Sequence, residues 1–158
     1  MANLLKLLLL FAVMIGAVWT VEGMDGEEVA ARNFTSETRI GFGLCSGRGD
    51  KRNCVVDGDS FHLGGQKIRL LGVDAPEIGS AMCAAEREKG EAARERLRAI
   101  LSSAPIRLTS DTRDRDQYGR LLRNARVDGR DVGETLIAEG LARKYRGRKE
   151  PWCEGARS

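Results

Sequence analysis

VVDGDS at residues 55–60, followed by RLLGVDAPE at residues 69–77, is the most informative stretch of this chain. The two segments carry four carboxylates and one arginine at expected strand ends and turns. Hard divalent cations prefer carboxylate and carbonyl oxygens as ligands. Phosphodiester hydrolysis uses such a cation, a guanidinium that holds the phosphate, and a base that activates water. The stretch therefore predicts a metal-assisted phosphodiesterase site, although Asp-Gly pairs are also common turn formers.

Short extended runs on both sides of this stretch predict a sheet. Ser60–Leu63 and Gln66–Val73 are joined by Gly64-Gly65, a dipeptide typical of a two-residue hairpin. Ile106–Thr109 follows a proline as another short strand, and Leu121–Val127 is a further one that ends at an Asp-Gly turn.

Two segments predict helices that cover this sheet. In Glu88–Ser102 the apolar residues fall on one stripe among many charged residues. Asp131–Glu134 is typical of a capping box, which opens a short helix through Glu139 that Gly140 ends. The members of the apolar stripe are Ala93, Leu97, Ile100 and Leu101. This order of elements predicts an α+β chain, an OB-like five-stranded β-barrel with two covering helices.

Four cysteines favour an oxidising compartment and two disulfides, for which three pairings exist. We favour Cys45–Cys54 and Cys83–Cys153, because the first pair closes a polar, glycine-containing loop. Zinc binding is the rival interpretation. Zinc is disfavoured because the chain has no Cys-x-x-Cys motif. Its one histidine, His62, also does not stand at a sequence spacing typical of metal ligands.

The first 23 of the 158 residues are typical of a targeting segment. Lys6 gives a short positive region, and Leu7–Val18 is an apolar run of signal-peptide length that is short for a membrane span. We therefore expect an exported protein, periplasmic or secreted, with an uncleaved membrane anchor as the alternative. Residues 24–44 are expected to be poorly structured, residues 45–153 to form one domain, and residues 154–158 to form a tail.

The net charge of +3 excludes a strongly basic protein that coats nucleic acid, so the distribution of charge matters more. Arg143–Lys149 holds five cations and one aromatic residue. Such a segment either attracts phosphate backbones or is a solvated tail. Arg48-Gly49-Asp50 matches an adhesion tripeptide, but so short a motif arises often by chance, and we treat it as part of a polar loop.

Taken together, the motifs resemble the thermonuclease family, the staphylococcal nuclease-like calcium-dependent nucleases. The resemblance covers roughly residues 53–145, and its spaced motifs agree in order. The matching segments are Val55–Ser60, Arg69–Glu77, Gly90–Ala92, Asp116–Arg120 and Gly140–Ala142. The order of strands and helices also agrees with the fold of that family. Its best-known members carry a third helix after the last of these segments, which we expect to be missing here, with the Cys83–Cys153 bridge replacing its packing.

Asp59 and Asp74 are the expected carboxylate ligands of a calcium ion, projecting from the ends of neighbouring strands. The resemblance implies the same roles, and it implies that Ala75 gives the metal its backbone carbonyl. The family usually has threonine at that position, so this chain lacks a hydroxyl that helps to order water. Asp57 is expected either to shape the turn or to act outside the direct ligands, and the turn is the simpler interpretation.

Arg69 and Arg120 are the expected catalytic phosphate clamps, because a guanidinium matches two phosphate oxygens and stays charged throughout the reaction. Glu77 follows Pro76 in a loop and is the expected general base. The resemblance also implies the role of Glu77, and it implies that the 5′ P–O bond breaks to leave 3′-phosphates.

Substrate contacts are expected from Tyr118 and Tyr145, which could stack on the bases of a single strand, and from Arg143 and Lys144. Tyr118 stands where the resembled family places a substrate-contacting tyrosine. Gln117 stands where that family often has lysine, which weakens one phosphate contact.

The sequence therefore predicts an exported calcium-dependent endonuclease that hydrolyses DNA and RNA, with single-stranded or locally unpaired regions preferred. The alternative is a non-catalytic OB-fold module that binds nucleic acid without cutting it. An adhesion protein that uses the Arg-Gly-Asp tripeptide is a third, weaker interpretation. No protein partner is implied, and a monomer is expected.

Overall fold

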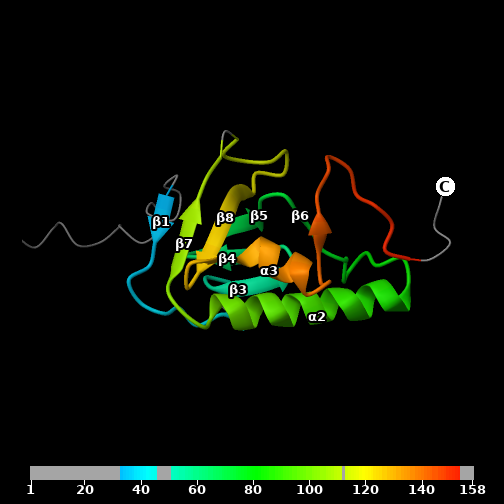
Figure 1. Ribbon diagram of the computed structural model, residues 1–158, viewed down its shortest axis with the longest axis horizontal. Helices are drawn as coiled ribbons and strands as arrows, with labels where there is room; N and C mark the ends of the chain where they lie inside the picture. The colour runs from blue at the N-terminus through cyan, green and yellow to red at the C-terminus, as the bar shows by residue number, and fades with distance from the viewer. Residues whose placement is uncertain (1–32, 46–50, 112, 154–158) are drawn as a thin grey trace, which may run out of the picture.

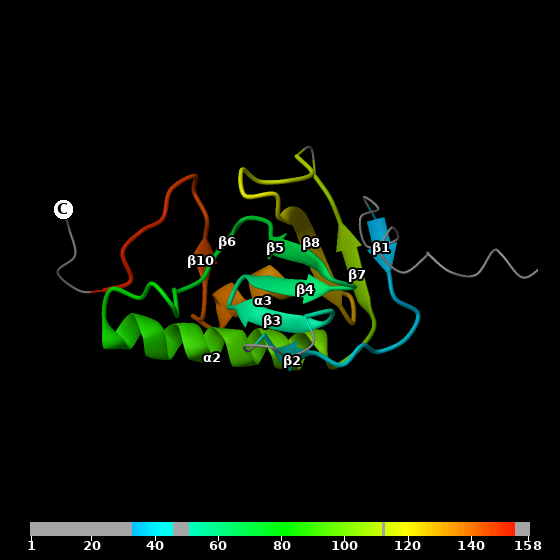
Figure 2. The same ribbon diagram turned by 180° about the vertical axis from the view of Figure 1, so that it is seen from behind.

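The computed structural model describes residues 33–45, 51–111 and 113–153, and it shows a mixed sheet with two helices against it (Figures 1 and 2). The described strands are β1 Asn33–Thr35, β2 Gly43–Leu44, β3 Cys54–Asp57, β4 Ser60–Leu63, β5 Gln66–Leu70, β6 Val73–Asp74, β7 Ile106–Thr109, β8 Leu121–Val127, β9 Arg130–Asp131 and β10 Arg143–Lys144. The described helices are α2 Ala84–Leu101 and α3 Val132–Ala138. The predicted α+β composition is therefore present.

The main sheet has the order β1-β7-β8-β5-β4-β3-β2, with β9 paired to β8, and β6 pairs separately with β10. Neighbouring strands are antiparallel except for β5 beside β8 and β2 beside β3, which are parallel. The predicted closure into a five-stranded barrel is not seen, because β1 takes the free edge of β7 and β2 takes the free edge of β3. In the described residues the sheet is open.

Residues 33–44, which the sequence analysis placed outside the domain, supply β1 and β2 to this sheet. Each is short, and neither shows a long apolar alternation that would mark it as a strand. The predicted targeting segment, the Arg-Gly-Asp tripeptide and the predicted tail fall outside the described residues. Among the helices that the structure describes, none is long and apolar enough to cross a membrane.

The predicted hairpin at Gly64-Gly65 joins β4 to β5, and both glycines have positive φ angles of 57° and 83°, as a tight hairpin turn requires. The predicted strand Gln66–Val73 is interrupted, because Gly72 has a φ of 70° and turns the chain between β5 and β6. After this turn Asp74 pairs with Arg143 of β10.

Helix α2 begins at Ala84, one turn before the predicted start, with Cys83 as its N-cap. It lies along the sheet next to β3, and the predicted apolar stripe faces the core, since Ala93, Leu97 and Leu101 are fully buried (Figure 1). Helix α3 begins as predicted at a capping residue, Asp131, whose side chain accepts the N–H of Glu134 at 2.9 Å.

Both predicted disulfides are present in the structure. Cys45 is bonded to Cys54 with a Cα–Cα distance of 5.0 Å, and Cys83 is bonded to Cys153 with a Cα–Cα distance of 6.1 Å. The second bridge spans 70 residues and ties the end of the described chain to the start of α2. After α3, residues 139–153 form β10 and irregular chain, without a further helix in this described segment.

Gly90 is the point at which α2 touches the loop that follows β6. A Cβ atom on Gly90 would lie 2.8 Å from the carbonyl oxygen of Pro76 and 3.0 Å from that of Glu77. Backbone atoms cannot give way as the end of a flexible side chain can. The loop that carries Glu77 therefore rests directly on the helix backbone.

Gly90→Ala is expected to lower the free energy of unfolding by about 1–3 kcal/mol, because the added methyl group overpacks this contact. Alanine is the better helix former by only about 1 kcal/mol, so the overpacking dominates. Chemical denaturation measures the change. Gly79→Ala is the matched control in the same loop, since nothing lies within 4 Å of its added Cβ atom. A Gly90→Ala variant at least as stable as the Gly79→Ala variant would contradict the packing argument.

Candidate active site

The turn between β3 and β4 presents the first two carboxylates. Asp57 accepts the N–H of Asp59 on its Oδ1 at 3.2 Å, a side-chain contact that shapes such a turn. Gly58 lies between them because there is no room for a side chain: its Cβ atom would lie 2.6 Å from the Cβ of Ala93 and 2.7 Å from the Cβ of Ala75. The turn is therefore pressed against α2 and against the chain that follows β6.

Asp59 is buried, and both of its oxygens are engaged. Its Oδ2 accepts a hydrogen bond from Arg69 at 2.5 Å, and its Oδ1 accepts one from the Ser60 hydroxyl at 2.8 Å. Arg69 also donates to the carbonyl of Val73 at 3.0 Å. Such charge-assisted contacts fix the arginine between β4 and the start of β6. The structure thus brings Asp59 and Arg69 together, as the sequence analysis expected.

Asp74 lies beside this pair with a different environment. It is 3% exposed, and its Oδ1 has no hydrogen-bond partner among the described residues. Burial raises the pKa of Asp74 above its usual range, with Lys149 opposing the shift and the charge of Asp59 adding to it. Ala75 follows, with its N–H 3.5 Å from the Oδ2 of Asp59.

A buried carboxylate oxygen without a partner is costly, and a bound cation removes that cost. The donor set around Asp59 and Asp74 consists of oxygens, which suits a hard cation such as calcium or magnesium. The residues present therefore fit a divalent metal ion on the oxygens of Asp59 and Asp74, with the backbone of Ala75 adjacent.

Asp57 carries the clearest perturbation of the site. Burial, followed by the neighbouring charge of Asp59, raises the pKa of Asp57 from 3.8 to about 6. The carboxylates of Asp57 and Asp59 repel one another when both are ionised, and the raised pKa of Asp57 means that it holds a proton up to mildly acidic pH.

Glu77 projects from the loop between β6 and α2 and is half-buried. Its side chain contacts Lys149, and its other oxygen accepts a weak hydrogen bond from Ser80 at 3.4 Å. A pocket of about 360 Å³ opens here. Its charged lining residues are Asp74, Glu77, Glu86, Lys149 and Glu150, and its apolar ones include Met82, Pro151 and Trp152. The predicted base and one predicted metal ligand therefore line the same pocket.

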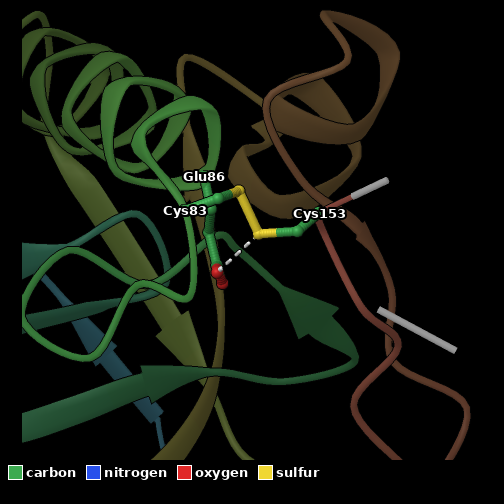
Figure 3. A group of neighbouring side chains, drawn as sticks. All are labelled: Cys83, Glu86 and Cys153. Carbon is green, nitrogen blue, oxygen red and sulfur yellow. Dashed lines mark hydrogen bonds between the residues drawn. A yellow bond between two sulfur atoms is a disulfide. The ribbon is translucent and has the colours of Figure 1, made fainter. Parts of the chain in front are cut away.

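Glu86 holds the Glu77 loop in place, and the sequence analysis did not identify it. It is 6% exposed, and its carboxylate accepts the N–H of Glu77 at 3.3 Å and the N–H of Met82 at 2.8 Å. Figure 3 shows the same carboxylate against the Cys83–Cys153 disulfide, 3.6 Å from the Sγ of Cys153. The available signal was its position three residues after the N-cap Cys83, where an acid commonly reaches back to free backbone N–H groups.

Cys83, Glu86 and Cys153 also have the close ligand-atom spacing of a metal site. The two sulfurs are bonded to each other, so neither is a thiolate that could bind zinc. The group is a structural junction between α2, the Glu77 loop and the end of the described chain.

Arg120 lies at the end of the loop between β7 and β8. Within the described part of the chain, it forms no hydrogen bond or ion pair with the acid cluster, by which we mean Asp57, Asp59 and Asp74. Its guanidinium contacts Asp116 at 2.6 Å and lies over the ring of Tyr118, with its centre 5.4 Å from the ring centroid. Tyr118 is 74% exposed. The structure thus holds Arg120 and Tyr118 together, and it shows no contact of either with Asp59, Asp74 or Glu77 among the described residues.

A fully buried arginine anchors this loop, which the sequence analysis also missed. Arg123 lies in β8 and contacts Asp114 at 2.8 Å and the carbonyl of Leu122 at 2.9 Å. Strand β8 is buried on both faces, so its arginine could not be recognised as internal from alternation alone.

The basic segment has mixed surroundings. Arg143 stacks on Trp152 at 3.7 Å from the ring centroid and donates to the carbonyl of Pro151 at 3.0 Å. Lys144 contacts Glu134 at 3.3 Å, and both side chains are largely exposed. Tyr145 is 43% exposed and is held through its backbone N–H, which donates to Gly72 at 2.8 Å. Arg143 therefore serves the packing of this segment, whereas Tyr145 faces solvent.

Comparison with known proteins finds relatives for most of the domain. A family model described as staphylococcal nuclease homologue matches residues 67–157, more than half of the chain. Endonuclease YncB of Bacillus subtilis (strain 168) is 41% identical over 94 residues, which cover 56% of this chain and 44% of that protein. The succinoglycan biosynthesis protein ExoI of Rhizobium meliloti (strain 1021) is 38% identical over 94 residues, covering 56% of this chain and 48% of that protein. A thermonuclease of Staphylococcus hyicus is 31% identical over 93 residues, which cover 56% of this chain and 54% of that protein.

The chain spans about half the length of these curated relatives. Their names include two nucleases and one protein named for succinoglycan biosynthesis, so the reaction does not follow from similarity alone. Asp57 and Asp59 also precede residue 67, where the family match begins. The family model therefore says nothing about these two residues.

Asp57→Asn is expected to stabilise the metal-free protein at pH 7.5 by about 1–3 kcal/mol, since each pKa unit corresponds to about 1.4 kcal/mol. The raised pKa means that Asp57 keeps its proton in the folded state after the unfolded chain has lost it. Its contribution to stability is therefore fully present below about pH 4 and is lost as the pH rises through about 6. The advantage of the asparagine variant should shrink toward pH 4.

Urea denaturation in excess chelator, repeated between pH 4 and pH 8, measures this difference. Asp128→Asn, in an exposed turn, controls for the loss of an aspartate elsewhere. An advantage of Asp57→Asn that is equal at pH 4 and pH 7.5 would show that repulsion within the acid cluster is not its source.

Proposed function

The chain belongs to the family of staphylococcal nuclease homologues, and we propose that it is an exported calcium-dependent nuclease that hydrolyses phosphodiester bonds of DNA and RNA. In this proposal Asp59, Asp74 and the backbone carbonyl of Ala75 hold the metal ion. Arg69 and Arg120 bind phosphate, and Glu77 activates the attacking water.

The observation that carries the proposal is the buried Oδ1 of Asp74, which lacks a partner in the described residues and lies next to the Asp59–Arg69 pair. A cluster built only for stability would pair such an oxygen, because an unpaired buried acceptor costs about 1–3 kcal/mol. In a site that binds a cation, such an oxygen has no protein partner because it is a ligand of the ion. Calcium supports the proposal better than zinc, because it accepts carboxylate and carbonyl oxygens in an irregular cage.

A bound calcium ion would polarise the scissile phosphate and stabilise its extra negative charge in the transition state. Arg69 is fixed at the same place by Asp59 and Val73, so its remaining donors point to one location without further ordering. This preorganisation favours the transition state, since no rotation of the guanidinium is needed during the reaction.

Glu77 takes the proton of a water molecule as its oxygen attacks phosphorus. The bond from phosphorus to the 5′ oxygen breaks, the departing oxygen takes a proton from solvent, and the products are a 3′-phosphate and a 5′-hydroxyl. Glu77 suits this role because it is half-exposed at the rim of the pocket and its backbone is fixed by Glu86.

Substrate binding beyond the phosphate falls to exposed aromatic rings and cations. Tyr118 and Tyr145 are both exposed and offer faces on which unpaired bases can stack. Arg120 lies against Tyr118, so this loop presents a ring and a guanidinium together. Lys144 is also exposed, whereas the stacking of Arg143 on Trp152 makes a direct contact with substrate a secondary role for that residue. Single-stranded or locally unpaired nucleic acid fits this arrangement.

Export is supported by the chain's own covalent structure. All four cysteines are paired in two disulfides, a state that persists in oxidising compartments. Together with the apolar run at Leu7–Val18, this favours a periplasmic or secreted monomer.

Calcium is expected to support cleavage of plasmid DNA and of RNA, and excess chelator is expected to abolish it, because the ligands are hard oxygens. Calcium should also raise the thermal unfolding midpoint of the protein, since an ion that binds only the folded state stabilises it. Asp74→Asn is the matched variant, in which both effects should be lost. Undiminished cleavage in chelator would exclude a metal-assisted reaction.

Glu77→Gln is expected to lower turnover by about 10²–10⁴, the usual contribution of a general base. Binding of a short oligonucleotide should persist, because removing a carboxylate near phosphate reduces repulsion. Rates under saturating substrate and binding by fluorescence anisotropy give the two readouts. Glu88→Gln, on the exposed face of α2, is the control for the same chemical change.

Arg69 is tested by Arg69→Lys rather than Arg69→Ala, because alanine would leave the buried Asp59 without its partner. Lysine keeps the charge and loses the fork of donors, so turnover should fall while folding is retained. Near-normal turnover in both the Glu77 and the Arg69 variants would favour a non-catalytic nucleic-acid-binding module instead.

A further inference from the structure

Lys149 lies inside the candidate active site although it follows Glu77 by 72 residues. Its Nζ contacts the carboxylate of Glu77, and Lys149 is the foremost positive charge acting on Asp74. It lines the pocket of about 360 Å³ together with these two acids. Among the described residues that line this pocket, Lys149 is the one cation. The mechanism above gives it no role.

The segment that carries Lys149, residues 143–153, is here named the C-terminal strap. It leaves the fold at β10, whose Arg143 stands opposite Asp74 in the register with β6. Gly147 turns the chain with a φ of 87°. The disulfide of Cys153 with Cys83 then fastens its end to the start of α2. Figures 1 and 2 show the strap beyond β6, at one end of the sheet, where it rises away from α2 and returns to the first turn of that helix.

The strap is also braced across its own base. Arg143, at its beginning, stacks on Trp152 and donates to the carbonyl of Pro151, near its end. Lys89 of α2 adds a second cation, 5.3 Å from the Trp152 ring centroid. Because the strap is fixed at both ends, little further conformational entropy is lost when Lys149 is held at the pocket.

The charges of the site leave a place for such a cation. Arg69 is already bound by Asp59 and Val73, and Arg120 is bound by Asp116 on another loop. The pocket itself is lined by the carboxylates of Asp74, Glu77, Glu86 and Glu150, and Lys149 is the one cation among its described lining residues. A phosphate that enters this pocket therefore finds its side-chain counter-ion in Lys149, in addition to any bound divalent ion.

We propose that Lys149 is a further phosphate-binding residue of this site, delivered by the disulfide-fastened C-terminal strap. The inference rests on the proposed nuclease function and adds a substrate contact to it. In the free protein Lys149 neutralises Glu77. When nucleic acid enters the pocket, the phosphate takes the ammonium group as its counter-ion, and the carboxylate of Glu77 is released to accept the proton of water.

The test compares Lys149→Ala with Lys149→Arg on a short single-stranded oligonucleotide, with calcium. Lys149→Ala should raise KM about tenfold and change kcat less than threefold, because a hydrogen bond to a charged group is lost from substrate binding. Lys149→Arg keeps the charge and should restore KM to within about threefold of the parent protein. Lys67→Ala, which removes an exposed lysine of β5, is the control and should stay within about twofold.

The strap itself is tested by Cys83→Ser combined with Cys153→Ser, after denaturation has shown that the protein is folded. Opening the bridge should raise KM as Lys149→Ala does, and adding Lys149→Ala to it should raise KM little further, since the two changes remove one contact. Independent, multiplying effects would overturn the role of the strap. Folding is not at risk in Lys149→Ala, because that side chain is 57% exposed.

Two results would overturn the assignment of Lys149. One is a KM for Lys149→Ala equal to that of Lys67→Ala. The other is faster cleavage by Lys149→Ala, which would mean that the strap blocks the pocket. Binding of a nuclease-resistant phosphorothioate oligonucleotide in chelator provides a readout that needs no activity, with about tenfold weaker binding expected for Lys149→Ala alone. A parent protein that binds but does not cleave would refute the nuclease function, and the binding comparison would still decide the role of Lys149.

Discussion

The contact between the backbone of the Asp57–Asp59 turn and helix α2 is the constraint on which the site depends. At Gly58 the chain comes so close to Ala93 and Ala75 that an added Cβ would lie 2.6–2.7 Å from theirs, and at Gly90 the helix comes equally close to the loop of Pro76 and Glu77. Side chains of any size at these points would push the carboxylates apart. Helix α2 therefore sets the position of the Asp57–Asp59 turn relative to the loop of Glu77, the segments that carry the proposed metal ligand Asp59 and the proposed base. Glycine at these two positions allows the close approach of the helix and the loops. Because the interior is densely packed, a larger side chain would move the neighbouring loop.

This close packing forces like charges together, and the structure relieves the repulsion unequally. Asp59 receives Arg69 and Ser60, whereas Asp57 is left with a raised pKa and Asp74 with a bare oxygen. A protein selected for stability alone would replace such a cluster by apolar residues of similar size. The described hydrophobic core beside this cluster is apolar, and the buried acid Glu86 is paired with backbone N–H groups, whereas Asp74 keeps an oxygen without a partner in the described residues. That concentration of unfavourable electrostatics is what a cation site requires before its ion arrives, and it is the reason that perturbed acids mark functional sites in general.

The sequence was informative wherever a local rule determines the structure. The Gly64-Gly65 hairpin, the Asp131 cap and the buried stripe of α2 are set by neighbouring residues. The favoured disulfide pairing is present too, although the sequence left three pairings open. Prediction failed where long-range pairing decides. β1 and β2 are strands only because β7 and β3 offer free edges, and this pairing keeps the sheet open instead of closed. Glu86 and Arg123 look like ordinary surface charges along the chain, yet both are buried, because their partners lie in loops whose course no local pattern specifies.

The Cys83–Cys153 bridge is a long-range contact that holds two local segments of the candidate site in place. A disulfide that spans 70 residues stabilises mainly by restricting the unfolded chain, so its position in the native fold is free to serve another purpose. Here it lies over the buried carboxylate of Glu86, which in turn holds the backbone of Glu77 (Figure 3). The same covalent bond thus fixes the loop with the base from one side and the strap with Lys149 from the other. In the described residues after α3 the chain forms β10 and irregular structure, and this bridge fastens the two segments that line the pocket of Glu77 and Lys149. The order of the active site is therefore tied to the oxidation state of a bond that no reacting group touches.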